Sequence, residues 1–211
     1  MKGAIFDLDG VLVDTAVYHF AAWKELANKL GFEFTKEDNE RLKGVSRMKS
    51  LEILLSIGKI DASAEQKEKW ANEKNERYVK LLENLSEDSL LNGAKQYLTK
   101  LRSDGVLIAL GSASKNAPLI LKRTGIEDMF DAIVDGNSVS KAKPDPEIFL
   151  KGAELLGLKP QDCTVFEDSQ AGIEAARRGG FLVVAIDKYN VLKGANSYIK
   201  SLGDMLKNKE A

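Results

Sequence analysis

The chain has 211 residues, of which 44% are hydrophobic and 30% charged, a composition typical of a globular protein and unlike that of a disordered chain. Its 31 lysines and arginines nearly cancel its 32 aspartates and glutamates, so no broad basic surface is available for nucleic acid or an anionic membrane. No apolar run approaches the roughly 20 residues of a membrane span, and early acids in MKGAIFDLDG argue against a secretory signal. We therefore expect a cytoplasmic protein.

Short apolar runs predict the strands of a parallel sheet. They alternate with amphipathic helical segments, which is the pattern of an α/β protein with a Rossmann-like core. The runs are GAIFDL (3–8), VLIALG (106–111), DAIVDG (131–136), CTVFED (163–168) and FLVVAI (181–186).

Almost 100 residues between the first two runs show only helical patterns. A crossover between parallel strands needs a single helix, so the excess predicts an inserted α-helical cap domain. The predicted helices span 15–30, 35–43, 47–57 and 64–84. We place the cap at residues 15–86, called the cap segment below, and the core at 1–14 and 87–211.

Helix start and stop signals support this division. Thr35 and Ser63 begin capping-box sequences, TKED and SAEQ. Gly31, Gly58 and Gly105 are expected to follow helices, because glycine adopts the backbone conformation in which helices commonly end.

Acidic side chains follow the first predicted strand in the sequence FDLDG. Side chains alternate along a strand, so Asp7 and Asp9 fall on one side, about 5 to 7 Å apart. Two carboxylates at that separation repel each other unless a cation lies between them or one keeps a proton. Taken alone, such a pair is more often two solvated acids in a loop.

Other strand ends also carry chemistry, and in an open α/β sheet the ligand site lies beyond these ends. Ser112 and Ser114 lead into a predicted helix whose free amides suit a phosphate, although the same residues could be an ordinary helix cap. Lys143 precedes a helix predicted to start at Pro146, and Glu167 and Asp168 end the fourth run. Lys143 could be a solvated loop lysine, and Glu167 and Asp168 could be partners of a helix dipole, but we expect all three to meet at one edge.

The motifs FDLDGVLVDT, GSASKN, KPDPEIF and VFEDSQAGIEAA resemble, in order, those of the haloacid dehalogenase superfamily of aspartate-nucleophile phosphotransferases. The resemblance implies that Asp7 is the nucleophile and Asp9 the general acid and base. It also implies that Ser112 and Lys143 hold the transferring phosphoryl group. A Mg²⁺ cofactor would be bound by Asp7, the Asp9 carbonyl and Asp168, with Glu167 nearby.

A further set of sequences, DTAVYHFAAWKELA, RLKGVSR and NEKNERYV, resembles the sugar-phosphate mutases of this superfamily. The resemblance implies that His19 and Lys74 connect the cap to Asp9 and that Thr15 lies at the hinge. It also implies that the phosphate that is not transferred is bound by Arg47 together with Ser114, Lys115 and Asn116. The implied substrate-binding residues are Thr15, His19, Trp23, Lys43, Gly44, Val45, Arg47, Lys74, Ser112, Ala113, Ser114, Lys115, Asn116 and Lys143.

His19, the single histidine, has an alternative interpretation. Phe20, Trp23, Ala27 and Leu30 form an adjacent apolar stripe, and a histidine beside such a stripe is more often a packing residue.

We therefore expect a monomeric, Mg²⁺-dependent enzyme that acts on small sugar phosphates and binds neither nucleic acid nor membrane. The expected reaction interconverts β-glucose 1-phosphate and glucose 6-phosphate through a bisphosphate. The alternatives are a sugar-phosphate phosphatase with the same core and a non-catalytic phosphosugar-binding module.

Overall fold

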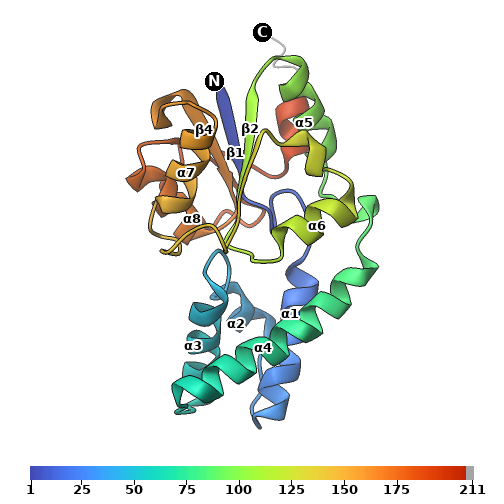
Figure 1. Ribbon diagram of the computed structural model, residues 1–211, viewed down its shortest axis with the longest axis vertical. Helices are drawn as coiled ribbons and strands as arrows, with labels where there is room; N and C mark the ends of the chain where they lie inside the picture. The colour runs from blue at the N-terminus through green and yellow to red at the C-terminus, as the bar shows by residue number, and fades with distance from the viewer. Residues whose placement is uncertain (208–211) are drawn as a thin grey trace.

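A six-stranded parallel sheet lies above a group of four helices in the computed structural model, which describes residues 1–207 (Figure 1). Residues 208–211, part of the predicted core, lie outside the described residues. The sheet order is β3-β2-β1-β4-β5-β6. The strands are β1 (Gly3–Phe6), β2 (Leu107–Gly111), β3 (Ala132–Val134), β4 (Cys163–Glu167), β5 (Leu182–Ile186) and β6 (Ser197–Ile199). The α/β fold and all five predicted strands are confirmed.

Strand β1 is the centre of the sheet. Ile5 pairs with Ala109 of β2 on one side and with Val165 of β4 on the other, and every residue of β1 is buried. Parallel strands covered on both faces are typically continuous apolar runs, which explains the sequence GAIF. The residue that follows β1 therefore lies at the middle of the sheet's carboxyl edge.

Two pairs of helices cover the sheet. Helices α5 (Ala94–Ser103) and α6 (Ala117–Thr124) pack on one face, and α7 (Glu147–Leu155) and α8 (Gln170–Arg178) on the other (Figure 1). Phe6 and Phe166, on neighbouring strands, stack on the first face with ring centroids 4.6 Å apart. Predicted starts at Asn116 and Pro146 are N-caps here.

The cap segment contains four α-helices. They are α1 (Ala16–Lys29), α2 (Lys36–Glu40), α3 (Arg47–Gly58) and α4 (Ala64–Leu81). Both predicted capping boxes, at Thr35 and Ser63, are present. One expectation was wrong: Gly58 is the last residue of α3, and the left-handed residue that ends the helix is Lys59. A Cβ on Gly58 would press into the ring of Phe32, so the glycine permits close packing.

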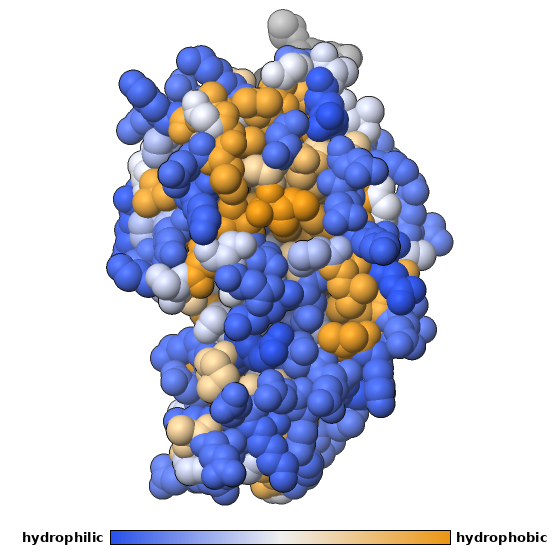
Figure 2. All heavy atoms as spheres, viewed as in Figure 1, coloured by the Kyte–Doolittle hydropathy of each residue, from blue (hydrophilic) through white to orange (hydrophobic). Residues whose placement is uncertain are grey.

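The cap segment has its own buried apolar cluster, the cap cluster, which includes Trp23, Phe34, Leu51 and Leu54. Tyr78 belongs instead to the cluster that packs on the sheet face covered by α5 and α6. Figure 2 shows hydrophobic side chains gathered over the sheet on this face and a largely hydrophilic surface over α3 and α4. That residues 15–86 form a separate domain stays a prediction.

The chain crosses between the two parts twice, and the two crossings lie side by side. Val13 and Leu90 form an antiparallel bridge. The Asp14 N–H donates to the Ser89 carbonyl at 3.1 Å, and the Leu91 N–H donates to the Leu12 carbonyl at 2.9 Å. The cap segment is thus inserted between two paired extended segments.

Sequence analysis missed strand β6 and the organisation of the segment before it. The carboxylate of Asp187 accepts the N–H groups of Val191 and Leu192. The side-chain amide of Gln170 donates to the Lys193 carbonyl and accepts the Lys193 N–H, each at 3.1 Å. Side chains distant in sequence therefore fasten a segment that shows no periodic pattern.

Within residues 1–207, every helix is too short or too polar to cross a bilayer.

Leu54→Ala tests the contribution of the cap cluster. Leu54 is fully buried, so we expect its truncation to lower the free energy of unfolding by about 2 to 5 kcal/mol. Leu155→Ala is the matched control. Leu155 is 57% exposed, so its truncation should lower the free energy of unfolding by less than about 0.5 kcal/mol. Urea unfolding measures both, and equal midpoints would contradict the packing described.

Candidate active site

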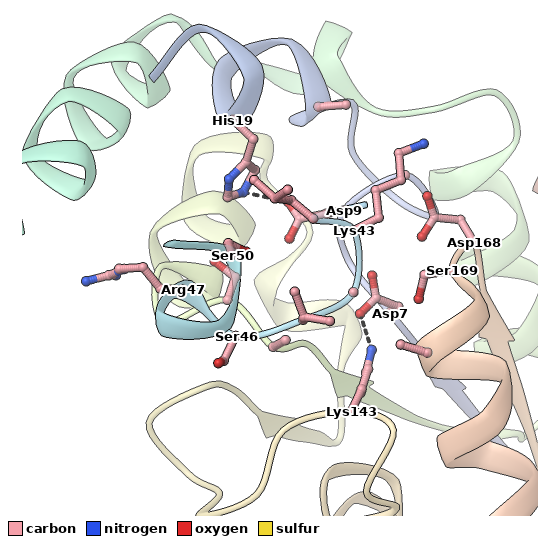
Figure 3. Close-up of a pocket in the computed structure, with 18 of the residues that line it drawn as sticks. Asp7, Asp9, His19, Lys43, Ser46, Arg47, Ser50, Lys143, Asp168 and Ser169 are labelled. Carbon is pink, nitrogen blue, oxygen red and sulfur yellow. Dashed lines mark hydrogen bonds and ion pairs between the residues drawn. The ribbon is translucent and has the colours of Figure 1, made fainter. Parts of the chain in front are cut away.

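The carboxyl ends of the strands meet at a cavity of about 1260 Å³ that is also lined by the cap segment. Asp7 and Asp9 follow β1, Ala113 to Asn116 follow β2, and Asp168 follows β4. Residues from the cap segment line the cavity opposite these strand ends (Figure 3). Parallel strands bring these side chains together because all their carboxyl ends lie at one edge.

A buried ammonium group joins two carboxylates at the base of the cavity. Lys143 Nζ lies 2.6 Å from Asp7 Oδ1 and 2.7 Å from Glu167 Oε1, and its side chain is fully buried (Figure 3). Although burial opposes the charged form, these carboxylates hold the pKa of Lys143 above its usual range. Burial raises the pKa of Asp7 to about 7, against the lowering effect of Lys143.

The Glu167 carboxylate that contacts Lys143 is held in place by Ser169. Its second oxygen accepts hydrogen bonds from the backbone N–H and the hydroxyl of Ser169, at 2.6 and 2.8 Å. Glu167 itself is fully buried and is absent from the cavity wall. Both carboxylate oxygens of Glu167 are therefore bonded to protein groups. Near the expected metal site, Glu167 acts as a residue that holds Lys143 in place.

Asp168 approaches the loop after β1 because Gly10 has no side chain. A Cβ on Gly10 would overlap the Asp168 carboxylate, and Gly10 has a φ of +84°, which favours glycine. Burial, followed by repulsion from Glu167 and Asp7, raises the pKa of Asp168 well above its usual value. Gly10 therefore lets a third acid face the end of β1.

This arrangement fits a hard divalent cation. Four carboxyl groups gather here, those of Asp7, Asp9, Glu167 and Asp168, and Lys143 pairs with two of them, Asp7 and Glu167. Burial, followed by effects of the neighbouring charges, raises the pKa of Asp7 and of Asp168, so a bound cation would stabilise their ionised forms. Within residues 1–207, no three acidic, histidine or cysteine side chains form a complete ligand set. Mg²⁺ commonly takes one or two carboxylates and completes its shell with water and substrate phosphate, so the residues suit it.

Asp9 is held from the cap segment. The hydroxyl of Thr15, at the start of α1, donates to Asp9 Oδ1, and His19 Nε2 lies 3.9 Å from the same oxygen (Figure 3). Lys74 Nζ lies 3.0 Å from His19 Nδ1. When Lys74 is protonated it can only donate, so Nδ1 then accepts and Nε2 carries the proton that faces Asp9. His19 therefore has two roles. Its Nε2 faces Asp9, and its ring packs against the ring of Tyr78, with centroids 4.1 Å apart.

Cationic groups gather on the cap side of the cavity. Burial and the neighbouring Arg47 lower the pKa of Lys74 to about 7, although Lys74 also lies over the rings of Trp23 and Tyr78. Burial, Lys74 and Arg47 lower the pKa of His19 well below its usual value. Positive charges that repel one another in this way favour a bound anion.

Nested hydrogen bonds shape the loop after β2. The Ser114 N–H donates to the Ser112 hydroxyl at 3.1 Å, and the Asn116 N–H donates to the Ser114 hydroxyl at 3.2 Å. Ser112 is buried beneath the cavity wall, whereas Ala113 and Lys115 line it. The loop thus presents polar groups and the start of α6 to the cavity.

The loop before α3 contacts the core directly. A Cβ on Gly44 would overlap the Ser169 hydroxyl, so the cap segment comes close to the motif that contains Asp168. Lys43 is half-buried and forms an ion pair with Glu40 at 2.7 Å. Val45 also lines the cavity.

Most predicted site residues therefore converge on one cavity. Three do not line it: Thr15, Ser112 and Glu167 lie beneath its wall, bonded to Asp9, Ser114 and Lys143. Direct contact of Thr15 and Ser112 with substrate stays a prediction.

Sequence reasoning missed several parts of the cavity wall, including residues of α2 and of the segment after β3. Asn75 of α4 lines it, and so does the segment after β5, including Lys188, Tyr189 and Val191. Because β5 ends at the same edge as β1, the strand-end argument that found Asp7 could have located this segment.

Comparison with known proteins agrees with this geometry. The family model for haloacid dehalogenase-like hydrolases matches residues 1–180. The chain belongs to the haloacid dehalogenase-like hydrolase family, whose phosphomutase members imply a metal cofactor.

Several similar proteins are enzymes of phosphorylated sugars. The chain is 41% identical over 207 residues to beta-phosphoglucomutase of Bacillus subtilis (strain 168), covering 97% of this chain and 92% of that protein. The crystal structure of beta-phosphoglucomutase from Clostridium difficile superposes with a TM-score of 0.92 at 42% identity, covering 97% and 93% of the two chains. A phosphorylated carbohydrates phosphatase of Thermotoga maritima is 35% identical, covering 85% and 82%.

Lys143→Met tests the buried ion cluster. The variant leaves two carboxylates without their counter-cation, so we expect the free energy of unfolding to fall by about 3 to 5 kcal/mol at pH 8 in EDTA. Lys141→Met is the matched control, because its ammonium group is exposed and lies 3.8 Å from Asp145.

The loss should be smaller at pH 5.5 than at pH 8. Without Lys143 the pKa of Asp7 rises further above its unfolded value near 4, so the folded state gains a proton that the unfolded state lacks. Stability contributed by that proton is present at low pH and is lost as pH rises through the folded pKa. A pH-independent loss in urea unfolding would contradict the electrostatic explanation.

Proposed function

We propose that the protein is a β-phosphoglucomutase, which interconverts β-D-glucose 1-phosphate and D-glucose 6-phosphate through β-glucose 1,6-bisphosphate. The observation that carries the proposal is a cavity with cationic side chains on two different parts of its wall. Acids and Lys143 form one end, while Arg47, Lys74 and the loop after β2 lie on other parts of its wall. A bisphosphate needs both ends, because one phosphate must be held while the other reacts.

Asp7 is the nucleophile in this proposal. Its carboxylate attacks phosphorus, the bond from phosphorus to the sugar oxygen breaks, and an aspartyl phosphate forms. Asp9 donates a proton to the leaving oxygen and takes one from the acceptor hydroxyl in the second half-reaction. The contacts from Thr15 and His19 orient Asp9 for both steps. Lys143 and Ser112 stabilise the charge on the phosphoryl oxygens.

Asp7, Asp168 and the Asp9 carbonyl would hold Mg²⁺, which when bound supplies positive charge that offsets the phosphate charge facing Asp7.

The cap segment selects a sugar hydroxyl over water. Arg47 suits the phosphate that is not transferred, because its planar guanidinium donates two parallel hydrogen bonds. Lys43, Gly44 and Val45 close the cavity beside Ser169, which limits access of water to the aspartyl phosphate. Trp23 packs in the cap cluster and gives Lys74 an apolar wall.

We further propose that the enzyme is a monomer. Its substrates are charged sugar phosphates, and we place the reaction in the cytoplasm.

A sugar-phosphate phosphatase is the second candidate, favoured by the similarity to the Thermotoga maritima phosphatase. It would use the same Asp7 chemistry with water as the acceptor.

Phosphorus NMR with Mg²⁺, β-glucose 1-phosphate and a trace of β-glucose 1,6-bisphosphate separates the two candidates. We expect glucose 6-phosphate with little inorganic phosphate, and Asp7→Asn should abolish both products because it removes the nucleophile. Mainly inorganic phosphate would indicate the phosphatase. Full activity of Asp7→Asn would contradict the assigned chemistry.

Arg47→Ala tests the distal phosphate site. Loss of a charge-assisted bidentate contact should lower kcat/KM for β-glucose 1-phosphate about tenfold to hundredfold, and Arg47→Lys should recover only part of it. Acetyl phosphate serves as the control donor, since it can phosphorylate Asp7 but has no second phosphate. Its turnover should stay within about twofold of wild type, and an equal loss with both donors would contradict the assignment.

A further inference from the structure

A side-chain hydrogen bond crosses the cavity between the cap segment and the core. The amide nitrogen of Asn116 donates to the side-chain oxygen of Asn75 at 2.9 Å. Asn75 belongs to α4, Asn116 begins α6, and both line the cavity. The sequence resemblance that singled out Lys74 and Asn116 assigned nothing to Asn75.

Asn116 makes this contact in place of a local one. It is the N-cap of α6, a position where asparagine is favoured because its side-chain oxygen accepts an N–H from the first turn. Asn116 makes no such capping bond, and Pro118 in the first turn has no N–H to offer. Its side chain is turned instead toward α4, so local helix stability does not explain this orientation.

Neighbouring residues of α4 reach the two ends of the site. Lys74 contacts His19, which faces Asp9, and Asn75 contacts the loop that ends at Asn116. A single turn of one helix thus bonds to the acid–base end and to the loop after β2.

We propose that Asn75 is a positioning residue: it fixes residues 114–116 of the loop after β2 in the arrangement that holds the distal phosphate, and so joins that phosphate to the helix that carries Lys74. The proposal rests on the proposed function, because only a substrate with a second phosphate uses residues 114–116. Acetyl phosphate has no second phosphate, so turnover of the aspartyl phosphate that it forms on Asp7 should not depend on Asn75.

Asn75→Ala removes the acceptor and leaves every group assigned to phosphate in place. A hydrogen bond between neutral side chains supports an expected loss of about threefold to tenfold in kcat/KM for β-glucose 1-phosphate. The ratio of inorganic phosphate to glucose 6-phosphate should rise, and acetyl phosphate turnover should stay within about twofold of wild type. Glu76→Ala is the matched control, because Glu76 is the exposed next residue of α4.

A double-mutant cycle with Asn116→Ala identifies the partner. If the two side chains act through their mutual bond, the double variant should lose no more than about twofold beyond Asn116→Ala alone. Hydrogen–deuterium exchange without substrate gives a readout besides activity: the peptide that covers residues 112–119 should exchange faster in Asn75→Ala than in Glu76→Ala. Asn75→Ser replaces Asn75→Ala if thermal unfolding shows the alanine variant to be unfolded.

Equal kinetics for Asn75→Ala and Glu76→Ala, or additive losses in the double variant, would overturn the proposal. Failure of the proposed function looks different, since the wild-type protein would then form no glucose 6-phosphate. In that event unchanged exchange at 112–119 in the Asn75 variant overturns the positioning role, and faster exchange supports it.

Discussion

The buried ammonium group of Lys143 is the constraint on which the site depends. Without it, Asp7 and Glu167 would be buried charges beside one another, and burying even one unpaired charge costs several kcal/mol. Lys143 pairs with both carboxylates, and burial still raises the pKa of Asp7, so the charged form of Asp7 would gain from a second cation. The core can therefore bury these acids and still favour a bound cation beside a phosphoryl group at the same edge.

Asp9 depends on the other part of the molecule. Its contacts from Thr15 and His19 begin in α1, and His19 is oriented by Lys74 of α4. In the proposed mechanism the cap segment positions the acid–base group, Asp9, whereas the core holds the nucleophile, Asp7, through Lys143. Proton transfer to a sugar oxygen then requires the cap segment in place, whereas the charge cluster around Lys143 does not.

The five strands and the capping boxes could be predicted because each is encoded locally, by apolar runs such as GAIF and by paired residues such as Thr35 and Asp38. The grouping of Asp7, Ser112 and Asp168 at one edge of the sheet could also be predicted, because the carboxyl ends of parallel strands lie at the same edge. Strand β6 could not be found, since its residues are mostly exposed and it is held by contacts distant in sequence. Asn75 was missed because nothing local distinguishes it, and only the fold brings it to Asn116.

The bridge between Val13 and Leu90 bears on how such a protein can arise and be rebuilt. Paired antiparallel residues have Cα atoms about 4.5 to 5.5 Å apart, the spacing across the neck of a hairpin. A tight turn could therefore join the two crossings in place of the intervening helices without displacing β1 or β2. The two crossings thus fix where the inserted segment enters and leaves, so other helices could replace these as a module while Asp7, Lys143 and Glu167 keep their places in the core.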